Sequence, residues 1–381
     1  MKNILIYILL TVTFQNFMKA QNNTPNPNDT LRSILVNDNS NITISIYAPE
    51  AKNVSIGGGD IPGIYENGKM KRKENGVWSL NVGPIAPGAY RYNFNIDGVV
   101  VTDPKNTETS ESNMNMWSLF YVRGKDFMDC KDVPHGAISE VNYYSITLNK
   151  NRRMHIYTPP GYEISNMDFP VFYLLHGAFD CDDSWTTVGR AGFIIDNLIF
   201  EGKVKPMVIV MPAGHTKPFQ FGGAVPAKDE FIEDFLNEIK PYIEKNYRVI
   251  KNSQNTAIAG LSMGGGHTLN IAIPNLGDYG FIGVFSSGIF GINGGDSFLP
   301  NMGNQWENNN LKVLDNAKLK DKIKLIWFAT GKEDFLLETS RTTVKTLRKH
   351  NFNVIYNETE GGHTWTNWRD YLFQFSQLLF K

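Results

Sequence analysis

The stretch that decides the fold is TAIAGLSMGGG, residues 256–266. Its first four residues predict a buried strand, and a helical pattern runs from Met263 to Ile273. Ser262 stands at the junction, with Gly260 and Gly264 on either side. A sharp strand-to-helix turn leaves no room for a Cβ at these flanking positions, so it requires glycine there. The sequence therefore predicts a strained turn that presents the Ser262 hydroxyl at the start of a helix.

Strands and helices alternate on both sides of this turn. Apolar runs typical of buried strands occur at residues 171–175, 207–211, 256–259, 281–285, 324–329 and 353–357. Helical patterns occur at residues 229–247, 263–273, 338–350 and 365–380. Near-continuous apolar strands between helices indicate a parallel sheet that is covered on both faces. Residues 141–381 are therefore predicted to form an α/β domain, and the serine turn at the end of one of its strands is typical of the α/β-hydrolase type.

The preceding part of the chain has an all-β pattern. Residues 41–47, 77–82 and 90–96 alternate apolar and polar side chains, and glycine-containing turns separate them. Short strands with regular turns predict an immunoglobulin-like β-sandwich over residues 31–124, joined to the α/β domain by a linker over residues 125–140.

The N-terminus has the layout of a secretory signal peptide. Lys2 precedes an apolar run from Ile4 to Phe14, and a short polar segment ends at Ala20. This run is too short to span a bilayer, and no other stretch of the sequence is long and apolar enough to do so. We expect export to the periplasm or the medium after cleavage near Ala20, with residues 21–30 as a flexible lead-in.

Composition excludes several classes of partner. The 37 basic and 38 acidic side chains nearly cancel, so no strong field would attract nucleic acid or anionic lipid. Cys130 and Cys181 are too few for a disulfide scaffold, and we expect two unpaired thiols although export would permit a bond. The histidines and cysteines lack the paired spacings of zinc sites, so neither a metal nor another cofactor is expected.

A serine hydroxyl becomes a good nucleophile only beside a base and an orienting acid. In α/β-hydrolases these groups follow in the order serine, acid, histidine. The strand at residues 324–329 leads into Glu333 and Asp334, which are competing candidates for the acid. His363 lies on a glycine-flanked loop between the last strand and the last helix. All these positions follow carboxyl ends of predicted strands, where catalytic groups of parallel sheets collect.

Two backbone amides are candidates for stabilising the oxyanion. The first belongs to Met263, directly after the serine, and the second to Ala178, in the loop His176-Gly177-Ala178-Phe179 that follows a buried strand. His176 is interpreted as a structural residue that holds this loop, because no acid follows it in the required order. His267 is expected to face away from Ser262 on its helix.

Several motifs together resemble a known family. They are Val133-Pro134-His135-Gly136, Tyr157-Thr158-Pro159-Pro160-Gly161-Tyr162, Leu174-Leu175-His176-Gly177, Gly260-Leu261-Ser262-Met263-Gly264-Gly265 and Gly361-Gly362-His363-Thr364-Trp365. Over roughly residues 130–381 the chain resembles the esterase D superfamily and, within it, carbohydrate esterase family 1, which includes feruloyl and acetylxylan esterases. The resemblance implies Asp334 as the acid and Ala178 as an oxyanion donor.

The N-terminal region resembles carbohydrate-binding module family 48 in PGAYRYNF (residues 87–94), Asp97-Gly98 and Thr102-Asp103-Pro104. The resemblance implies binding of polysaccharide. The N-terminal region lacks an identifiable pair of sugar-binding aromatic residues. Trp78 and Tyr65 are interpreted as possible core residues. A spacer or a wall of the active site is an equally supported role for this region.

Together the two resemblances imply a secreted serine esterase that removes ester decorations from plant cell-wall polysaccharide or oligosaccharide. Feruloyl esters of arabinoxylan are the preferred substrate. An acetylxylan esterase and a siderophore esterase of the enterochelin type are the enzymatic alternatives, and a polysaccharide-binding protein with an inactive hydrolase domain is the non-enzymatic one. Candidate substrate contacts, all expected in loops near the site, are Phe179, Trp185 and Trp306. For the two tryptophans, packing within the loop is an equally supported role.

Overall fold

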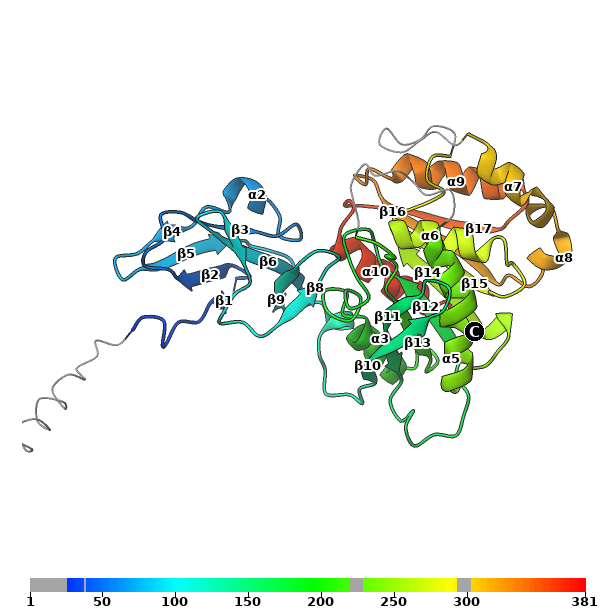
Figure 1. Cartoon of the computed structure of the whole chain (residues 1–381), viewed down its shortest axis with the longest axis horizontal. Helices are drawn as coiled ribbons and strands as arrows, with labels where there is room; N and C mark the ends of the chain where they lie inside the picture. Colours follow the sequence, from blue (N-terminus) through cyan, green and yellow to red (C-terminus); the bar gives the residue numbers. More distant parts are fainter. Residues whose placement is uncertain (1–25, 38, 219–228, 293–302) are drawn as a thin grey trace, which may run out of the picture. The chain divides into compact units, whose positions relative to one another are not determined.

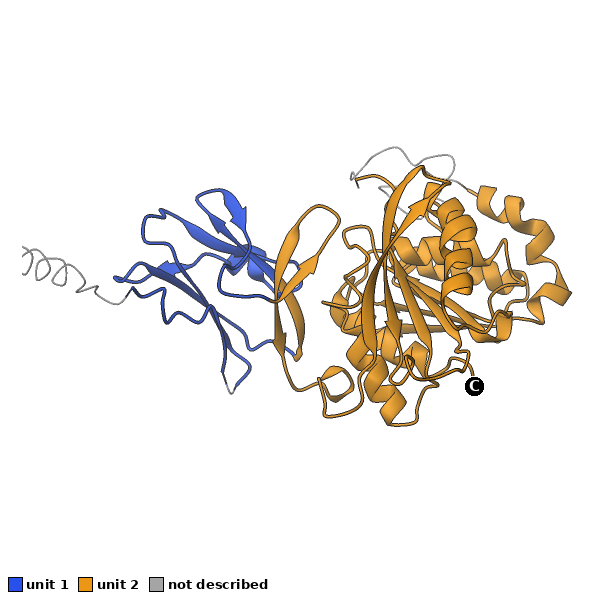
Figure 2. Cartoon of the chain, turned by 60° about the horizontal axis from the view of Figure 1, so that its bottom comes forward, with its two compact units in different colours: residues 1–86, 92–107 blue, residues 87–91, 108–381 orange. Residues whose placement is uncertain are grey.

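The computed structural model describes residues 26–37, 39–218, 229–292 and 303–381 (Figure 1). The predicted signal peptide and the first half of the lead-in lie outside these residues. Within them, no helix has the length and apolar character needed to cross a membrane. The chain divides into two compact units, of which the first contains Tyr92–Thr107 and the residues up to Ala86, and the second contains Pro87–Arg91 and Glu108–Lys381 (Figure 2).

Unit 1 is built from short β-strands. They are β1 (Ile34–Val36), β2 (Ile42–Tyr47), β3 (Val54–Gly57), β4 (Lys71–Arg72), β5 (Val77–Val82), most of β6 (Gly88–Ile96) and β7 (Val99–Val101), with the one-turn helix α2 (Ile64–Asn67). One sheet has the order β1-β2-β5-β4, and β6 pairs with both β3 and β7. Trp78 is a core residue, as expected, whereas the expectation of a buried Tyr65 is wrong because its side chain is 75% exposed on α2.

The division by packing falls at different residues from the predicted boundary. The hairpin of β8 (Thr109–Glu111) and β9 (Met116–Val122) belongs to unit 2, and Leu119 from β9 packs in its core together with Ala89. The predicted linker contains a turn of 3-10 helix, η1 (Asp126–Met128), and the first residues of a strand of the large sheet. Alternation in the sequence predicts a strand but does not specify the core on which that strand packs.

Unit 2 is centred on an eight-stranded sheet with the order β10-β11-β13-β12-β14-β15-β16-β17. Its strands are β10 (Ala137–Ser145), β11 (Lys150–Thr158), β12 (Val171–Leu175), β13 (Val208–Pro212), β14 (Thr256–Leu261), β15 (Phe281–Phe285), β16 (Leu325–Gly331) and β17 (Val354–Thr359). The pairs β10/β11 and β11/β13 are antiparallel, and all pairs from β13 to β17 are parallel. The carboxyl ends of the parallel strands therefore lie along one edge of the sheet.

Helices cover both faces of this sheet, as the apolar strands require. They are α3 (Ala191–Phe200), α4 (Glu230–Asp234), the π-helical η2 (Phe235–Ile239), α5 (Lys240–Asn246), η3 (Ser253–Asn255, 3-10), α6 (Met263–Ala272), α7 (Gln305–Leu314), α8 (Ala317–Lys320), α9 (Leu337–Lys349) and α10 (Trp365–Ser376). Helices α3 and α10 pack with Phe172 and Leu174 of β12, whereas α5, α6 and α9 pack with its alternate residues Val171, Tyr173 and Leu175. The predicted α/β class with a preceding all-β region is confirmed.

Candidate active site

Ser262 lies between β14 and α6 in a backbone conformation that is rare for residues other than glycine. Its φ is 49° and its ψ is −119°. Such a conformation costs on the order of 1–3 kcal/mol and is retained only where the surrounding structure enforces it. Here the Ser262 amide donates to the carbonyl of Phe285 on the neighbouring strand, at 2.9 Å. The turn therefore holds the hydroxyl at the carboxyl end of the sheet.

The two flanking glycines are needed for close packing. A Cβ on Gly260 would lie 2.3 Å from the carbonyl of Gly264, and a Cβ on Gly264 would lie 2.6 Å from the carbonyl oxygen of His176. Real Cβ contacts do not approach this closely, so a side chain at either position would push α6 away from β12 and β14. Steric exclusion of a Cβ thus explains the two glycines of the motif identified in the sequence.

Ser262, His363 and Asp334 form a continuous row of hydrogen bonds. His363 Nε2 lies 3.0 Å from Ser262 Oγ, and His363 Nδ1 lies 3.0 Å from both carboxylate oxygens of Asp334. The side chain of Asp334 is fully buried, and that of His363 is 18% exposed. Because a carboxylate only accepts, its bond to Nδ1 places the proton there and leaves Nε2 to accept from the serine hydroxyl. Glu333, the competing acid, is exposed to solvent.

A close contact between two loops brings the acid and the histidine together. A Cβ on Gly331, at the end of β16, would lie 2.1 Å from the carbonyl oxygen of Gly361. Gly361 has a φ of 85°, which favours glycine, and Asn367 Nδ2 donates to the carbonyl of Glu360 at 2.8 Å. The Asp334 carboxylate also accepts from the Leu336 amide at 2.9 Å. Both side chains are therefore positioned by their own loops.

The backbone amides of Met263 and Ala178 are the predicted oxyanion donors. Met263 is the first residue of α6, where helical amides have no partner within the helix, and Ala178 follows β12 by three residues. Among the described residues neither amide donates a hydrogen bond. A Cβ on Gly177 would lie 3.4 Å from the Cβ of Ser262, which shows how closely this loop approaches the serine.

His176 is completely buried and holds the loop, as the sequence interpretation proposes. Its Nδ1 donates to the carbonyl of Gly177 at 2.8 Å, and its Nε2 accepts from the Gly214 amide at 2.7 Å. Burial lowers the pKa of His176 to about 4, so the ring is neutral near pH 7. His267, also buried, points to Asp229 with its Nε2 2.9 Å from a carboxylate oxygen. Neither His176 nor His267 is therefore placed to act as the catalytic base.

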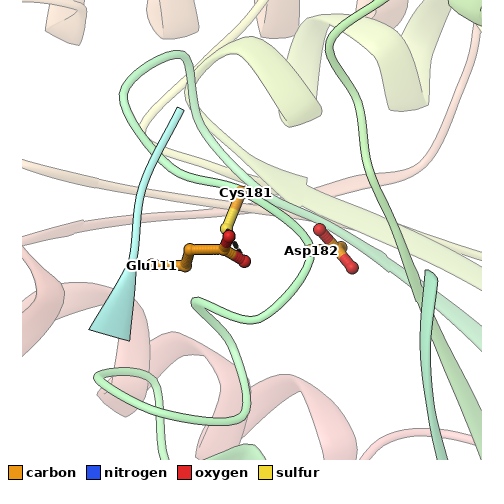
Figure 3. Close-up of side chains that lie close together, drawn as sticks. All are labelled: Glu111, Cys181 and Asp182. Carbon is orange, nitrogen blue, oxygen red and sulfur yellow. Dashed lines mark hydrogen bonds between the residues drawn. The ribbon is translucent and has the colours of Figure 1, made fainter. Parts of the chain in front are cut away.

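Glu111, Cys181 and Asp182 place atoms that could hold a metal ion within 4.8 Å of one another (Figure 3). The guanidinium of Arg153 already binds this cluster, because it donates hydrogen bonds to the carboxylates of Glu111 and Asp182. Burial raises the pKa of the Cys181 thiol far above its ordinary value, which disfavours the thiolate that metals bind. Burial would also raise the pKa of Asp182, but hydrogen bonds from His155 and Arg153 outweigh it and bring the value to about 2. The cluster therefore forms an ion pair that fixes the loop after Ala178.

The three aromatic residues predicted to contact substrate differ in their exposure to solvent. Trp185 is completely buried, packs at 5.0 Å between ring centroids against Trp365, and donates its Nε1 to the Leu175 carbonyl. Trp306 lies in α7 rather than in a loop, and only 9% of it is exposed. Burial contradicts a substrate contact for these two tryptophans, and Trp185 packs within its loop as the alternative interpretation holds. An aromatic residue between polar neighbours can still be drawn into a core. Phe179, beside Ala178, is 60% exposed.

Sequence reasoning missed Phe335. It follows Asp334 directly, is 60% exposed, and its ring lies 4.4 Å from that of His363, centroid to centroid. Its position one residue after the predicted acid is the only local signal that could have indicated it. Cys130 and Cys181 are both free thiols, as expected.

Comparison with known proteins finds a matching family for each part of the chain. The model of the esterase family matches residues 145–379, and that of carbohydrate-binding module 48, the isoamylase N-terminal domain, matches residues 32–122. An endo-1,4-beta-xylanase/feruloyl esterase of Xylanibacter ruminicola is 31% identical over 91% of this chain and 46% of its own length. The chain thus spans about half the length of that relative.

Two solved structures share the fold. A carbohydrate esterase family 1 ferulic acid esterase from Anaeromyces mucronatus is 23% identical, with a TM-score of 0.55 over 68% of this chain and 96% of its own. The enterochelin esterase of Shigella flexneri is 15% identical, with a TM-score of 0.64 over 94% of this chain and 97% of its own. With its fold, its serine turn and a family match across most of unit 2, the chain belongs to the esterase family.

Proposed function

We propose that this chain is a serine carboxylesterase that removes feruloyl esters from plant cell-wall polysaccharide such as arabinoxylan. The observation that carries the proposal is the hydrogen-bonded row from Ser262 through His363 to the buried Asp334. A hydroxyl, an imidazole and a carboxylate in this order are the parts of a two-step acyl transfer. The match to the esterase family supports the same reaction.

The reaction proceeds through a covalent acyl-enzyme. His363 accepts the proton of Ser262 as its Oγ attacks the ester carbonyl, and Asp334 keeps the imidazole in the required tautomer. The amides of Met263 and Ala178 stabilise the negative oxygen, each by roughly 3 kcal/mol in the transition state. His363 then protonates the departing sugar oxygen, which leaves as a hydroxyl. Water loses a proton to His363 as it attacks the acyl-enzyme, and His363 returns that proton to Ser262 Oγ as the acid is released.

Two exposed rings favour an aromatic acyl group. Phe179 adjoins the candidate oxyanion donor Ala178, and Phe335 packs on His363, so both side chains lie next to reacting groups. Large exposed apolar side chains beside a reactive centre favour substrates that cover them. A feruloyl ring can cover such a surface, whereas an acetyl group is too small to do so. The relative from Xylanibacter ruminicola, described as a xylanase and feruloyl esterase, supports this choice.

The test is hydrolysis of three esters by the full chain: methyl ferulate, acetylated xylan and p-nitrophenyl acetate. We expect kcat/KM for methyl ferulate to exceed that for the acetyl esters. A preference for acetylated xylan would identify an acetylxylan esterase instead. If none of the three is hydrolysed, the esterase proposal fails and a polysaccharide-binding role gains support. Export after cleavage near Ala20 is part of the same proposal, and mass spectrometry of the mature N-terminus tests it.

A further inference from the structure

The peptide that carries the Ala178 amide is held at its other end by a histidine. The Gly177 carbonyl and the Ala178 N–H belong to the same planar peptide and point in opposite directions. His176 Nδ1 donates to that carbonyl at 2.8 Å, so the direction of the Ala178 N–H is fixed as well. A hydrogen bond to the carbonyl also polarises the peptide, which strengthens its N–H as a donor.

The next peptide is held by a second histidine, which sequence reasoning did not single out. His215 Nε2 lies 2.7 Å from the carbonyl oxygen of Ala178. A carbonyl oxygen only accepts, so Nε2 must carry the proton. Burial lowers the pKa of His215 to about 4, and the nearby His176 contributes to this shift. The ring of His215 is therefore neutral at the pH at which His363 would act as a base. Both peptides that flank the Cα of Ala178 therefore have a fixed plane.

Both histidines are tied to one short segment, Ala213-Gly214-His215, which follows β13. Gly214 donates its amide to His176 Nε2 at 2.7 Å, and His215 supplies the second ring. A Cβ on Gly214 would lie 3.2 Å from His176 Nε2 and 3.3 Å from the Cε of Met263, so the segment also packs against the other candidate oxyanion residue. The 213–215 segment thus contacts both sides of the candidate oxyanion site.

A buried arginine holds the 213–215 segment in place. Arg152, on β11, is 8% exposed and donates through Nη1 and Nη2 to the carbonyls of His215 and Ala213. Its Nε donates to Asp234 at 3.2 Å, and the same carboxylate oxygen accepts from Tyr143 at 2.7 Å. A planar guanidinium with donors in fixed directions sets the position of two carbonyls at once. The contacts therefore continue from the sheet to Ala178.

We propose that His215 is a positioning residue for ester hydrolysis, which orients the Ala178 peptide through a hydrogen bond supported by Arg152. This inference rests on the proposed function, because it concerns the stabilisation of the oxyanion in that reaction. It assigns to His215 no contact with substrate. Its effect acts on the transition state, in which the oxygen is negatively charged, more than on the bound ester.

The experiment compares three variants of the full chain on whichever test ester the unaltered protein hydrolyses. His215→Leu keeps much of the volume but cannot donate, whereas His215→Gln places an amide Nε2 the same number of bonds from Cα. His135→Leu is the matched control, because His135 bonds to Asp196 and not to the Ala178 loop. Measurements are kcat, KM, inhibition by phenylboronic acid, whose serine adduct resembles the tetrahedral intermediate, and circular dichroism as a check of folding.

We expect His215→Leu to lower kcat roughly ten- to a hundredfold, with KM changed by less than about twofold and weaker inhibition by the boronic acid. His215→Gln should recover most of the loss, and His135→Leu should match the unaltered protein. The proposal is overturned if His215→Leu keeps full kcat, or if the Gln variant is as impaired as the Leu variant. If the unaltered protein hydrolyses no ester, the proposed function fails first and this inference fails with it.

Discussion

At the scale of single residues, two neighbouring acids have very different surroundings. Asp334 is buried and contacts His363 through both carboxylate oxygens, whereas Glu333 is exposed. A carboxylate that is hydrogen-bonded to Nδ1 holds the imidazole in one tautomer. The backbone conformation after β16 thus selects one of two chemically similar side chains.

Asp334→Asn should therefore lower kcat by about 10³- to 10⁴-fold with little change in fold, because an amide can donate to Nδ1 and favour the wrong tautomer. The matched control is Glu333→Gln, which removes the neighbouring charge without touching His363 and should change kcat by less than about threefold. Steady-state hydrolysis of p-nitrophenyl acetate measures both. Equal losses in the two variants would contradict the assignment of the acid.

At the scale of elements, the loop after β12 depends on neutral histidines. The pKa of His176 is about 4 in the folded chain, against an ordinary value of 6.5. Between these values the unfolded chain binds a proton that the folded chain does not, so acid favours unfolding. The stability that a neutral His176 allows is fully present above pH 6.5 and is lost as the pH falls toward 4.

We expect this one histidine to reduce the free energy of unfolding by about 3 kcal/mol between pH 7 and pH 4. Urea unfolding followed by circular dichroism at several pH values measures the decline. His176→Asn should be less stable at pH 7 and should show a shallower decline over the same range. An identical pH dependence in the two proteins would mean that His176 titrates normally in the folded state.

The elements that sequence patterns predict best are those in which all side chains have the same degree of burial. Strands β12 and β15 have the predicted ends because both faces of each are buried, which makes the sequence continuously apolar. The hairpin β10–β11 was missed because β10 is an edge strand with mostly exposed, mixed residues. Helix α3 was missed because it is buried on most sides and shows no amphipathic period.

The residues of the candidate site also differ in how well the sequence predicts them. Ser262, Asp334 and His363 each lie in a short motif at the end of a strand, so parallel topology alone brings them to one edge of the sheet. The contact of His215 with Ala178 joins residues 37 apart in sequence, and no local pattern encodes it. Burial of Trp185 likewise results from packing against Trp365 across the chain.

At the scale of the whole molecule, unit 2 includes residues that precede the predicted esterase domain. Arg91 pairs with Asp180 in the loop after Ala178 at 2.7 Å, and Ala89 accepts from the buried Arg369 at 3.3 Å. A chain that begins at residue 125 lacks both, together with the β8–β9 hairpin. Loss of partners for buried charged groups is strongly destabilising.

We therefore expect a chain of residues 125–381 to melt at least about 10 °C lower than the full chain and to lose most of its esterase activity. A chain of residues 31–381, which removes only the segment before the first strand, is the control and should behave as the full chain does. Calorimetry and ester hydrolysis measure both properties. Full stability and turnover in the 125–381 chain would show that the predicted boundary at the linker, and not the division by packing, defines the esterase unit.

The central claim is that Ser262 is the nucleophile, and its removal tests that claim most directly. Hydrolysis of p-nitrophenyl acetate and methyl ferulate should be compared between the full chain and Ser262→Ala, with circular dichroism to verify folding. The account predicts that kcat falls by at least about 10³-fold while the fold is unchanged, because the variant lacks the hydroxyl that is hydrogen-bonded to His363. Undiminished hydrolysis by the folded variant would contradict it.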